Sequence, residues 1–429
     1  MSAAQASAWG NLGWPPAAEI RRVDTRDADL PAVAGTLLPY GNGRSYGDSC
    51  LNPGGTLLAT RGLDRFIAFD ADTGVLACEA GVLLAEILDL VVPRGWFLPV
   101  TPGTRYVTVA GAIANDVHGK NHHAGGAFGA HVRSFELLRS DGSRRRCSPA
   151  ENADWFAATV GGLGLTGLVT QAELQLKRIA GNAIAVRNVR FSGLDEFFAL
   201  NAEAEREHEY AVAWIDCLAK TPRGVLMGGD HADADLPAPR GGRNVPLTPP
   251  LSLINHASLA AFNAAYYGKP WPAAQTVHYR PYFYPLDAVG HWNRIYGPRG
   301  FYQYQSVVPP AAARAATGEM LAAIAGSGQG SFLAVLKNFG ARSSSGLLSF
   351  PMAGTTLALD FPNHGAATLD LFARLDAIVR AAGGRLYPAK DARMPAAMFR
   401  AGYPRLAEFT SYVDPKFSSG FWRRVMENN

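Results

Sequence analysis

Three glycine-rich segments in the first half of the chain constrain its fold most strongly, at residues 39–49, 102–123 and 161–167. Glycine allows positive φ and close approach of other atoms to the backbone. The first segment, with Gly41, Gly43 and Gly47, can expose successive N–H groups, as pyrophosphate-binding loops do. It lacks the following amphipathic helix that a dinucleotide-binding Rossmann motif needs. A glycine hairpin would explain this segment alone, but three such segments indicate backbone approach to a large, flat ligand.

Composition narrows the class of protein. The 429 residues are 48% hydrophobic, which is enough for a sizeable core and excludes a disordered chain. The formal net charge of +4 is small, so nucleic acid is not the expected partner. The cysteines are far apart and form no CxxC pair, which favours a reducing compartment. No secretory signal or transmembrane helix is expected, because charged residues and a proline interrupt residues 80–100. We therefore expect a cytoplasmic protein or one peripheral at the inner membrane.

The first part of the chain, residues 1–182, is predicted to be an α+β domain. Short apolar runs separated by glycine are typical of strands, and Leu84, Ile87, Leu88 and Val91 have helical spacing. The patterns predict strands at residues 36–38, 55–59, 66–69, 75–79 and 168–177, and helices at residues 83–92 and 151–160.

Residues 183–384 are predicted to form a second domain, in which an antiparallel sheet is covered by helices. Strands are expected at residues 186–191, 210–215, 302–308, 333–339, 347–351 and 355–360, and helices at residues 194–207, 311–325 and 366–382. Residues 230–276 are long for a connection inside a domain, and we interpret them as a flexible lid.

Histidines cluster at positions 118, 122, 123 and 131. No carboxylate or thiol accompanies them at the spacing of a metal site, so no metal ligand is predicted. Hydrogen-bonded structural histidines are the simpler interpretation.

Several motifs, in this order along the chain, carry a resemblance to a known family: GRSYGD, DVHGKNHH, VGGLGLTG, FYQYQ, LKNFG, SFPM and GGRLYPAKDAR. Together they resemble flavoproteins of the vanillyl-alcohol oxidase type with a PCMH-type FAD domain, and among these the decaprenylphosphoryl-ribose 2-oxidases. The resemblance runs from about Trp14 to the C-terminus. It implies a two-subdomain FAD-binding domain at residues 1–182, completed by 385–429, and a substrate-binding domain at 183–384.

The resemblance also implies roles for individual residues. For FAD binding it implicates Gly41, Asn42, Gly43, Arg44, Ser45, Tyr46, Gly47, Gly103, Thr104, Thr108, Ala110, Gly111, Asn115, Val117, His118, Gly119, Leu168, Tyr387 and Lys390. For the substrate side it implicates Tyr282, Gln303, Gln305, Lys337, Phe339, Thr356 and Ala358. For catalysis it implicates Lys390, His118 and Tyr46, with Lys390 and His118 as alternative groups to handle the hydroxyl proton.

The implied activity is oxidation of the 2-hydroxyl of a polyprenylphosphoryl-ribose to the 2-keto compound. This is the first half of an epimerisation to the arabinose donor for the cell envelope, completed by a separate short-chain reductase. An oxidase of a free sugar, an aldonolactone or another alcohol is the alternative, and a flavin-binding subunit without turnover is a third reading. The first glycine segment contains no histidine, so FAD is expected to be non-covalent.

Two further features bear on the substrate. The mycobacterial enzymes carry asparagine and cysteine where this chain has Thr356 and Ala358. In the lid, a helix is expected at residues 251–267, with Leu251 and Phe262 on its apolar face. Arg240 and Arg243 precede it, as would suit a lipid-linked phosphosugar and peripheral membrane contact. The alternative is a helix packed on the second domain.

Overall fold

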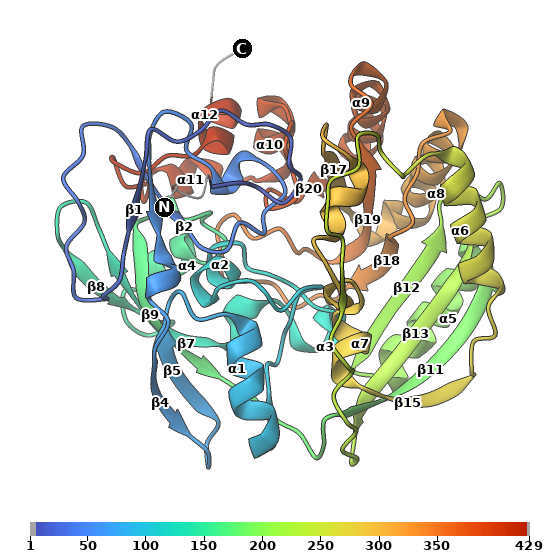
Figure 1. Ribbon diagram of the computed structural model, residues 1–429, viewed down its shortest axis with the longest axis horizontal. Helices are drawn as coiled ribbons and strands as arrows, with labels where there is room; N and C mark the ends of the chain where they lie inside the picture. Colours follow the sequence, from blue (N-terminus) through green and yellow to red (C-terminus); the bar gives the residue numbers. More distant parts are fainter. Residues whose placement is uncertain (1–5, 427–429) are drawn as a thin grey trace.

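Two groups of strands divide the chain in space. The computed structural model describes residues 6–426, and Figure 1 shows the small sheets in one half and a large sheet in the other. Helices and mostly antiparallel sheets occur in both halves, so the expected α+β class is confirmed.

The first half contains two main sheets. A parallel three-stranded sheet has the order β1-β3-β2, and an antiparallel five-stranded sheet has the order β4-β5-β9-β7-β8. Their bounds are β1 Glu19–Arg22, β2 Leu37–Tyr40, β3 Thr56–Ala59, β4 Phe66–Asp70, β5 Val75–Glu79, β7 Val132–Leu138, β8 Arg144–Cys147 and β9 Leu168–Gln175. A separate short ladder joins β6 (Trp96–Phe97) to β10 (Lys177–Arg178).

The second half is built on an eight-stranded sheet with the order β15-β11-β13-β12-β18-β19-β17-β20. Its strands are β11 Ala183–Ser192, β12 Tyr210–Asp216, β13 Arg223–Ala232, β15 Ala274–His278, β17 Phe301–Val308, β18 Ala334–Phe339, β19 Gly354–Pro362 and β20 Arg385–Leu386. The neighbouring pairs are antiparallel. β14 (Arg243–Asn244) pairs with β16 (Val289–Gly290) outside this sheet.

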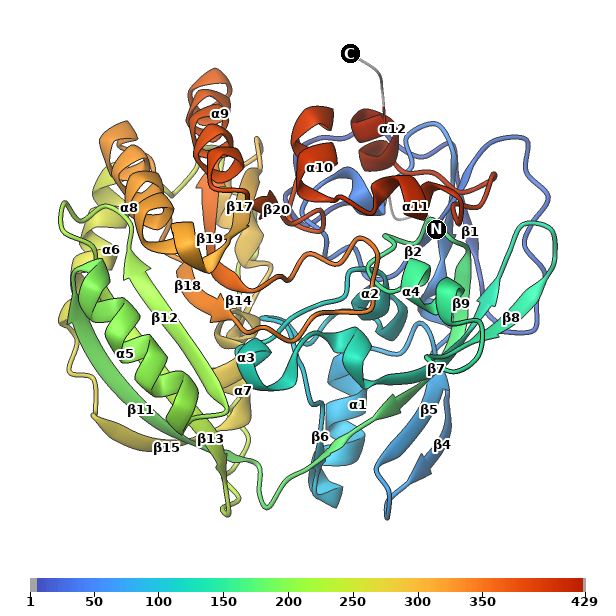
Figure 2. The same cartoon turned by 180° about the vertical axis from the view of Figure 1, so that it is seen from behind.

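Three helices cover one face of the large sheet: α5 (Leu194–Glu207), α8 (Pro310–Ser327) and α9 (Ala366–Ala381). Figure 2 shows them side by side on this face. The opposite face is turned towards the first half, and this geometry places the functional site. The other helices are α1 Leu84–Val91, α2 Val109–Ala114, α3 His122–Gly125, α4 Ala153–Thr159, α6 His256–Gly268, α7 Tyr279–Phe283, α10 Ala396–Gly402, α11 Leu406–Thr410 and α12 Gly420–Met426. Short 3₁₀ turns lie at Asp48–Cys50, Thr60–Gly62, Val92–Arg94, Phe128–His131, Pro285–Ala288 and Trp292–Tyr296.

Two sequence predictions are wrong. Residues 347–351 are not a strand but a buried loop, in which the ring of Phe350 stacks 4.5 Å from that of Tyr387. The lid helix begins at His256 rather than Leu251, because Asn255 caps it by accepting a hydrogen bond from Ser258 N. Leu251 precedes the helix and is 77% exposed. An apolar run does not distinguish a strand from a buried loop, and the capping residue determines where this helix begins.

Candidate active site

A cavity of about 540 Å³ lies between the two halves and is lined by residues from both. All three glycine-rich segments reach it, as do β17, β18, β19 and the turn after β20. Most of the residues implicated by sequence line this cavity, namely Gly41, Asn42, Gly43, Arg44, Ser45, Tyr46, Gly103, Thr104, Thr108, Ala110, Gly111, Asn115, Val117, His118, Gly119, Leu168, Gln303, Gln305, Lys337, Thr356, Ala358, Tyr387 and Lys390.

The first two glycine segments are in direct contact. A Cβ at Gly41 would lie 2.5 Å from Thr108 Oγ1, so only glycine fits there. Thr108 in turn caps α2, since its Oγ1 accepts a hydrogen bond from Gly111 N at 3.1 Å. Gly43 has a φ of +59°, which favours glycine. These residues form one wall in which backbone, rather than side chains, faces the cavity.

Arg44 brings a positive charge to this wall, where burial lowers its pKa and Asp287 opposes that change. Its guanidinium lies 4.2 Å from the ring centroid of Trp9, and its Nε is buried without a hydrogen-bond partner. Among residues 6–426, no carboxylate forms an ion pair with it. A half-buried arginine that has a buried, unpartnered Nε and no ion pair can bind an anion, and a pyrophosphate group is such an anion. The backbone wall and Arg44 therefore fit FAD.

Three residues implicated by sequence do not line the cavity. Gly47 instead permits the approach of another segment, because a Cβ there would lie 2.1 Å from Asp391 O. Tyr282 packs against β13, where a Cβ at Gly229 would be 2.6 Å from its hydroxyl. It turns away from the cavity because α7 directs the next residue, Phe283, towards it. Phe339 lies behind His118, with the ring centroids 4.7 Å apart.

Both ring nitrogens of His118 are engaged. Nε2 lies 3.1 Å from Gln305 Nε2, and Nδ1 lies 3.0 Å from Lys337 Nζ. A neutral imidazole offers one donor and one acceptor. Either Gln305 turns its amide oxygen towards His118, or Lys337 is uncharged and accepts. Burial, followed by Lys337, lowers the pKa of His118 well below its usual value. His118 is therefore neutral and already hydrogen-bonded.

Lys337 is a buried lysine whose ammonium group loses its proton near neutral pH. Its Nζ donates a hydrogen bond to Gly119 O at 2.6 Å. Burial, and then Lys120, lowers its pKa to about 7. Burial also lowers the pKa of Lys120, another lining residue, to about 7. The cavity thus has a basic wall formed by side chains that change charge near neutral pH.

Lys390 projects from the turn after β20. Its Nζ lies 4.1 Å from the ring centroid of Tyr46, and the backbone of Tyr46 donates to Ala389 O at 3.0 Å. The turn is also fixed by Tyr387, whose hydroxyl donates to Asn115 O at 2.9 Å. Lys390 thus lies at the junction of the first glycine segment, the second glycine segment and the large sheet.

Comparison with known proteins agrees with this geometry. A model described as the FAD binding domain matches residues 33–148. The decaprenylphosphoryl-β-D-ribose oxidase of Mycolicibacterium smegmatis is 38% identical over 412 residues, which cover 91% of this chain and 89% of that protein. The chain belongs to this oxidase family. It is an FAD-dependent oxidoreductase, and the expected family, fold class and cofactor are confirmed.

Two other relatives are similar over different lengths of the chain. An uncharacterized protein of Streptomyces coelicolor is 33% identical over 371 residues, covering 80% of this chain and 100% of that protein. The Delta(24)-sterol reductase of Homo sapiens is 28% identical over 170 residues, or 39% of this chain and 32% of that protein.

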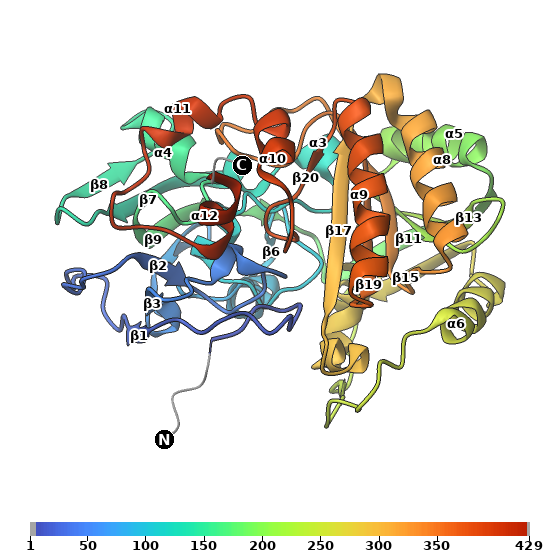
Figure 3. The same ribbon diagram turned by 90° about the horizontal axis from the view of Figure 1, so that it is seen from above.

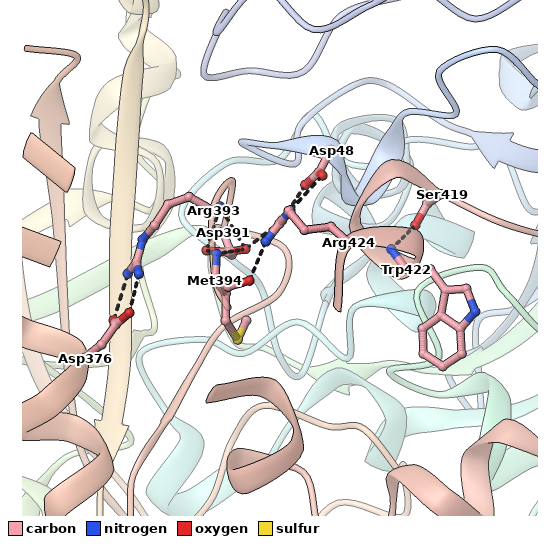
Figure 4. Close-up of polar contacts among 8 residues, drawn as sticks. All are labelled: Asp48, Asp376, Asp391, Arg393, Met394, Ser419, Trp422 and Arg424. Atoms are coloured by element: carbon pink, nitrogen blue, oxygen red, sulfur yellow. Dashed lines mark hydrogen bonds and ion pairs between the residues drawn. The ribbon is translucent and has the colours of Figure 1, made fainter. Parts of the chain in front are cut away.

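In this member of the oxidase family, one arginine near the end of the described chain ties the site together. Figure 4 shows Arg424 of α12 between Asp48 and Asp391. Its Nη2 lies 2.7 Å from Asp48 Oδ1 and 3.0 Å from Asp391 Oδ2, and its Nη1 donates to Met394 O at 2.6 Å. Asp48 belongs to the first glycine segment, and Asp391 directly follows Lys390. Arg424 therefore fixes the two segments that carry Tyr46 and Lys390.

Sequence reasoning missed several residues of the site. Lys120 and Trp214 line the cavity, as do Val212 and Phe283. Lys120 lies two residues after His118 in the same motif, and its closeness to a predicted site residue could have identified it as a lining residue. Trp214 follows an alternating pattern on β12, which places every second side chain on the cavity face. Among the described residues, no group of three histidine, cysteine or acidic side chains is placed to hold a metal.

Proposed function

We propose that this enzyme oxidises the 2-hydroxyl of a polyprenylphosphoryl-β-D-ribose to the 2-keto compound, the first half of an epimerisation to the arabinose donor. The near full-length identity to an oxidase named for such a substrate carries this proposal. Bound FAD would supply the acceptor for the hydride that leaves the alcohol carbon. The protein supplies placement of the substrate, exclusion of water and a group to hold the hydroxyl proton.

Lys390 is the residue we propose for the hydroxyl proton. His118 is less suited, because both of its ring nitrogens are hydrogen-bonded. Burial lowers the pKa of Lys390, so its amine can lose its proton more easily and act as a base. His118 and Lys337 would instead orient the sugar, together with the amide groups of Gln303 and Gln305 on β17. Tyr46 would hold Lys390 in place by contact of its ring with the ammonium group.

We propose the same division of labour between the two parts of the chain as the motifs imply. Residues 1–182 and 385–429 would bind the cofactor, and residues 183–384 would bind the substrate. An apolar part of the cavity wall, formed by Trp214, Tyr266, Leu286 and Val289, suits the first units of a prenyl chain. A separate short-chain reductase would complete the epimerisation.

We further propose that the lid contacts a membrane. Within the lid, residues 236–276 contain no aspartate or glutamate but include Arg240, Arg243 and Lys269. Large apolar side chains are exposed here, with Leu247 and Leu251 at 77% and Leu253 at 56%. Figure 3 shows α6 standing out from the body on the side of the large sheet opposite α5. Among the described residues no helix could cross a membrane, so contact would be peripheral.

The membrane contact can be tested by vesicle pelleting. The triple variant Leu247→Ser, Leu251→Ser, Leu253→Ser should bind phosphatidylglycerol vesicles at least about tenfold more weakly, because three apolar side chains no longer enter the bilayer. Leu369→Ser is the control, since Leu369 is 41% exposed but lies on α9. Equal pelleting of the triple variant and the unaltered protein would show that the lid does not bind membranes.

The activity can be tested by loss of the visible flavin band under anaerobic conditions. A prenylphosphoryl-ribose should bleach the FAD-loaded enzyme, while ribose and arabinono-lactone should not. Bleaching by a free sugar or lactone would favour the alternative oxidase, and no bleaching by any alcohol would favour a non-catalytic flavin subunit. Lys390→Ala should retain FAD but lose bleaching, and unchanged bleaching would remove Lys390 from the mechanism.

A further inference from the structure

A carboxylate extends the row of side chains that the large sheet presents to the cavity. On β19, Thr356, Ala358 and Asp360 alternate along the strand and therefore share one face. The pairing register places Gln305 opposite Ala358 and Gln303 opposite Asp360. Asp360 is fully buried and lies just beyond the cavity wall, behind Gln303.

The two oxygens of Asp360 have different surroundings. Oδ1 accepts a hydrogen bond from Gln303 Nε2 at 2.6 Å, whereas Oδ2 is buried without a hydrogen-bond partner. The hydroxyl of Tyr296 is also buried and unpartnered, and burial followed by Asp360 raises its pKa well above the usual value. An ionised carboxylate in such a place needs a positive charge nearby.

Lys390 is a positively charged side chain that lacks a negative partner in direct contact within the described residues. In the described part of the chain no carboxylate forms an ion pair with its Nζ, which lies over the ring of Tyr46. Burial lowers the pKa of Lys337 and of His118, and the positive charge of Lys390 adds to both effects. Burial lowers the pKa of Lys390 itself, and Asp360 is the charge that opposes this effect. Conversely, burial raises the pKa of Asp360, while Gln303 and Lys390 oppose that change.

We infer that Asp360 is a positioning residue of this active site: it provides the negative charge that balances Lys390 and fixes the orientation of the Gln303 amide. Among the described residues no ion pair joins the two side chains, so Asp360 acts on Lys390 by its charge and not through a direct contact. The Gln303 amide nitrogen is held by Oδ1, and its amide oxygen is buried without a hydrogen-bond partner and thus free to accept one. The catalytic consequence rests on the role proposed for Lys390. The electrostatic pairing does not.

The pairing can be measured without turnover. In FAD-loaded protein containing lysine labelled with ¹³C at Cε, the Cε resonance reports the titration of each ammonium group, and Lys390→Arg assigns its signal. Asp360→Asn keeps the shape and the acceptor for Gln303 but removes the charge. The midpoint of Lys390 should fall by about one pH unit or more, as expected for loss of a nearby opposite charge. An unchanged midpoint would overturn the inference.

Asp376→Asn is the matched control. Asp376 is also largely buried, but it pairs with Arg393 on the far side of β17, so the Lys390 midpoint should not move. If Asp360→Asn does not fold, Lys390→Met tests the same pairing in reverse. With carboxyl carbons labelled in aspartate, loss of the ammonium should raise the midpoint of Asp360, and no change would contradict the pairing.

The pH profile of flavin bleaching then separates this inference from the proposed activity. If Lys390 accepts the hydroxyl proton, Asp360→Asn should shift the rising limb of the profile to lower pH by the same amount as the Cε midpoint. A moved midpoint without bleaching by prenylphosphoryl-ribose in the unaltered enzyme would refute the activity but leave the pairing. A moved midpoint with an unmoved pH profile would show that Asp360 does not act on catalysis through Lys390.

Discussion

The guanidinium of Arg424 lies 3.0 Å from the carboxylate of Asp391, which directly follows Lys390 in the chain. Because the same guanidinium also holds Asp48 at 2.7 Å, one side chain connects the turn of Lys390 to the first glycine segment. Both carboxylates are almost fully buried, so they would repel each other without it.

Replacing Arg424 should therefore destabilise both the fold and the site. Arg424→Met should lower the free energy of unfolding by about 3 kcal/mol, since it leaves two buried carboxylates unpaired. Denaturant unfolding with FAD in excess measures this loss. Arg423→Met is the control, because Arg423 donates to the uncharged oxygens of Asn52, Pro53 and Ser418, and should cost about 1 kcal/mol. Adding Asp48→Asn to Arg424→Met should recover part of the loss, and no recovery would argue against charge as the cause.

Arg44 should contribute to binding of the cofactor. Arg44→Met should weaken FAD binding about tenfold to a hundredfold, the usual effect of losing a hydrogen bond between charged groups. Quenching of flavin fluorescence during titration of the apoprotein measures the affinity. Arg44 and Arg105 both lie over the ring of Tyr106, but Arg105 pairs with Asp89, so Arg105→Met should bind FAD normally. Equal affinities of the two variants would remove Arg44 from the pyrophosphate site.

The cofactor should be released intact when the protein is denatured. The first glycine segment contains no histidine, and burial raises the pKa of the nearby Cys50 thiol to about 12, so that thiol is not ionised. Acid precipitation should leave the yellow colour in the supernatant. Flavin that remains with the precipitated protein would reveal a covalent bond.

A thiol at position 358 should create a site for covalent ligands. Ala358 lines the cavity, and Cys50 is unreactive because its thiol stays protonated. Ala358→Cys should gain one adduct with a cavity-sized thiol reagent, as seen by intact mass, whereas the unaltered protein should gain none under the same conditions. An adduct on Cys50 in the unaltered protein would contradict the argument.

His231 should make the fold sensitive to acid. It packs between the rings of Phe97, Tyr210 and Phe283, where the two halves meet, and neither ring nitrogen has a partner. Burial, and then Lys177, lowers its pKa to about 3. Between about pH 6.5 and pH 3 the unfolded state binds a proton that the folded state excludes, so stability falls as the pH falls.

The size of this effect follows from the pKa difference. His231→Phe should lose about 2 kcal/mol less than the unaltered protein when the pH changes from about 7 to about 4.5. Urea unfolding at the two pH values measures the difference, with the exposed His364→Gln as control. Parallel losses in His231→Phe and the unaltered protein would show that other groups cause acid sensitivity.

Local patterns in the sequence predicted much of the architecture. The helix at residues 194–207 and the strand at residues 75–79 have the bounds that their periodicity indicated. The family resemblance, not a local pattern, implicated Gln303 and Gln305, and the structure puts both in the cavity wall. Local spacing predicts such elements because the periodicity of apolar residues shows which side of a segment packs against a buried surface.

Other features depend on partners far away in the chain. Arg424 and Asp48 are 376 residues apart, and nothing near either residue indicates that they meet. The direction of Tyr282 depends on α7, a short helix whose pattern is too brief to recognise. Asp360 carried a usable signal, since a carboxylate directly after the apolar run Leu357, Ala358 and Leu359 is unusual, but its relation to Lys390 is visible only in the folded chain.

The tie between Arg424 and the first glycine segment has a consequence for how the enzyme is made. The glycine segments leave the ribosome early, but the turn of Lys390 and helix α12 follow only after most of the chain has been translated. At ordinary rates of synthesis this delay is on the order of tens of seconds. During that time the glycine segments of the nascent chain lack the rest of the FAD site. We therefore expect loading of the cofactor to be a late step of biogenesis.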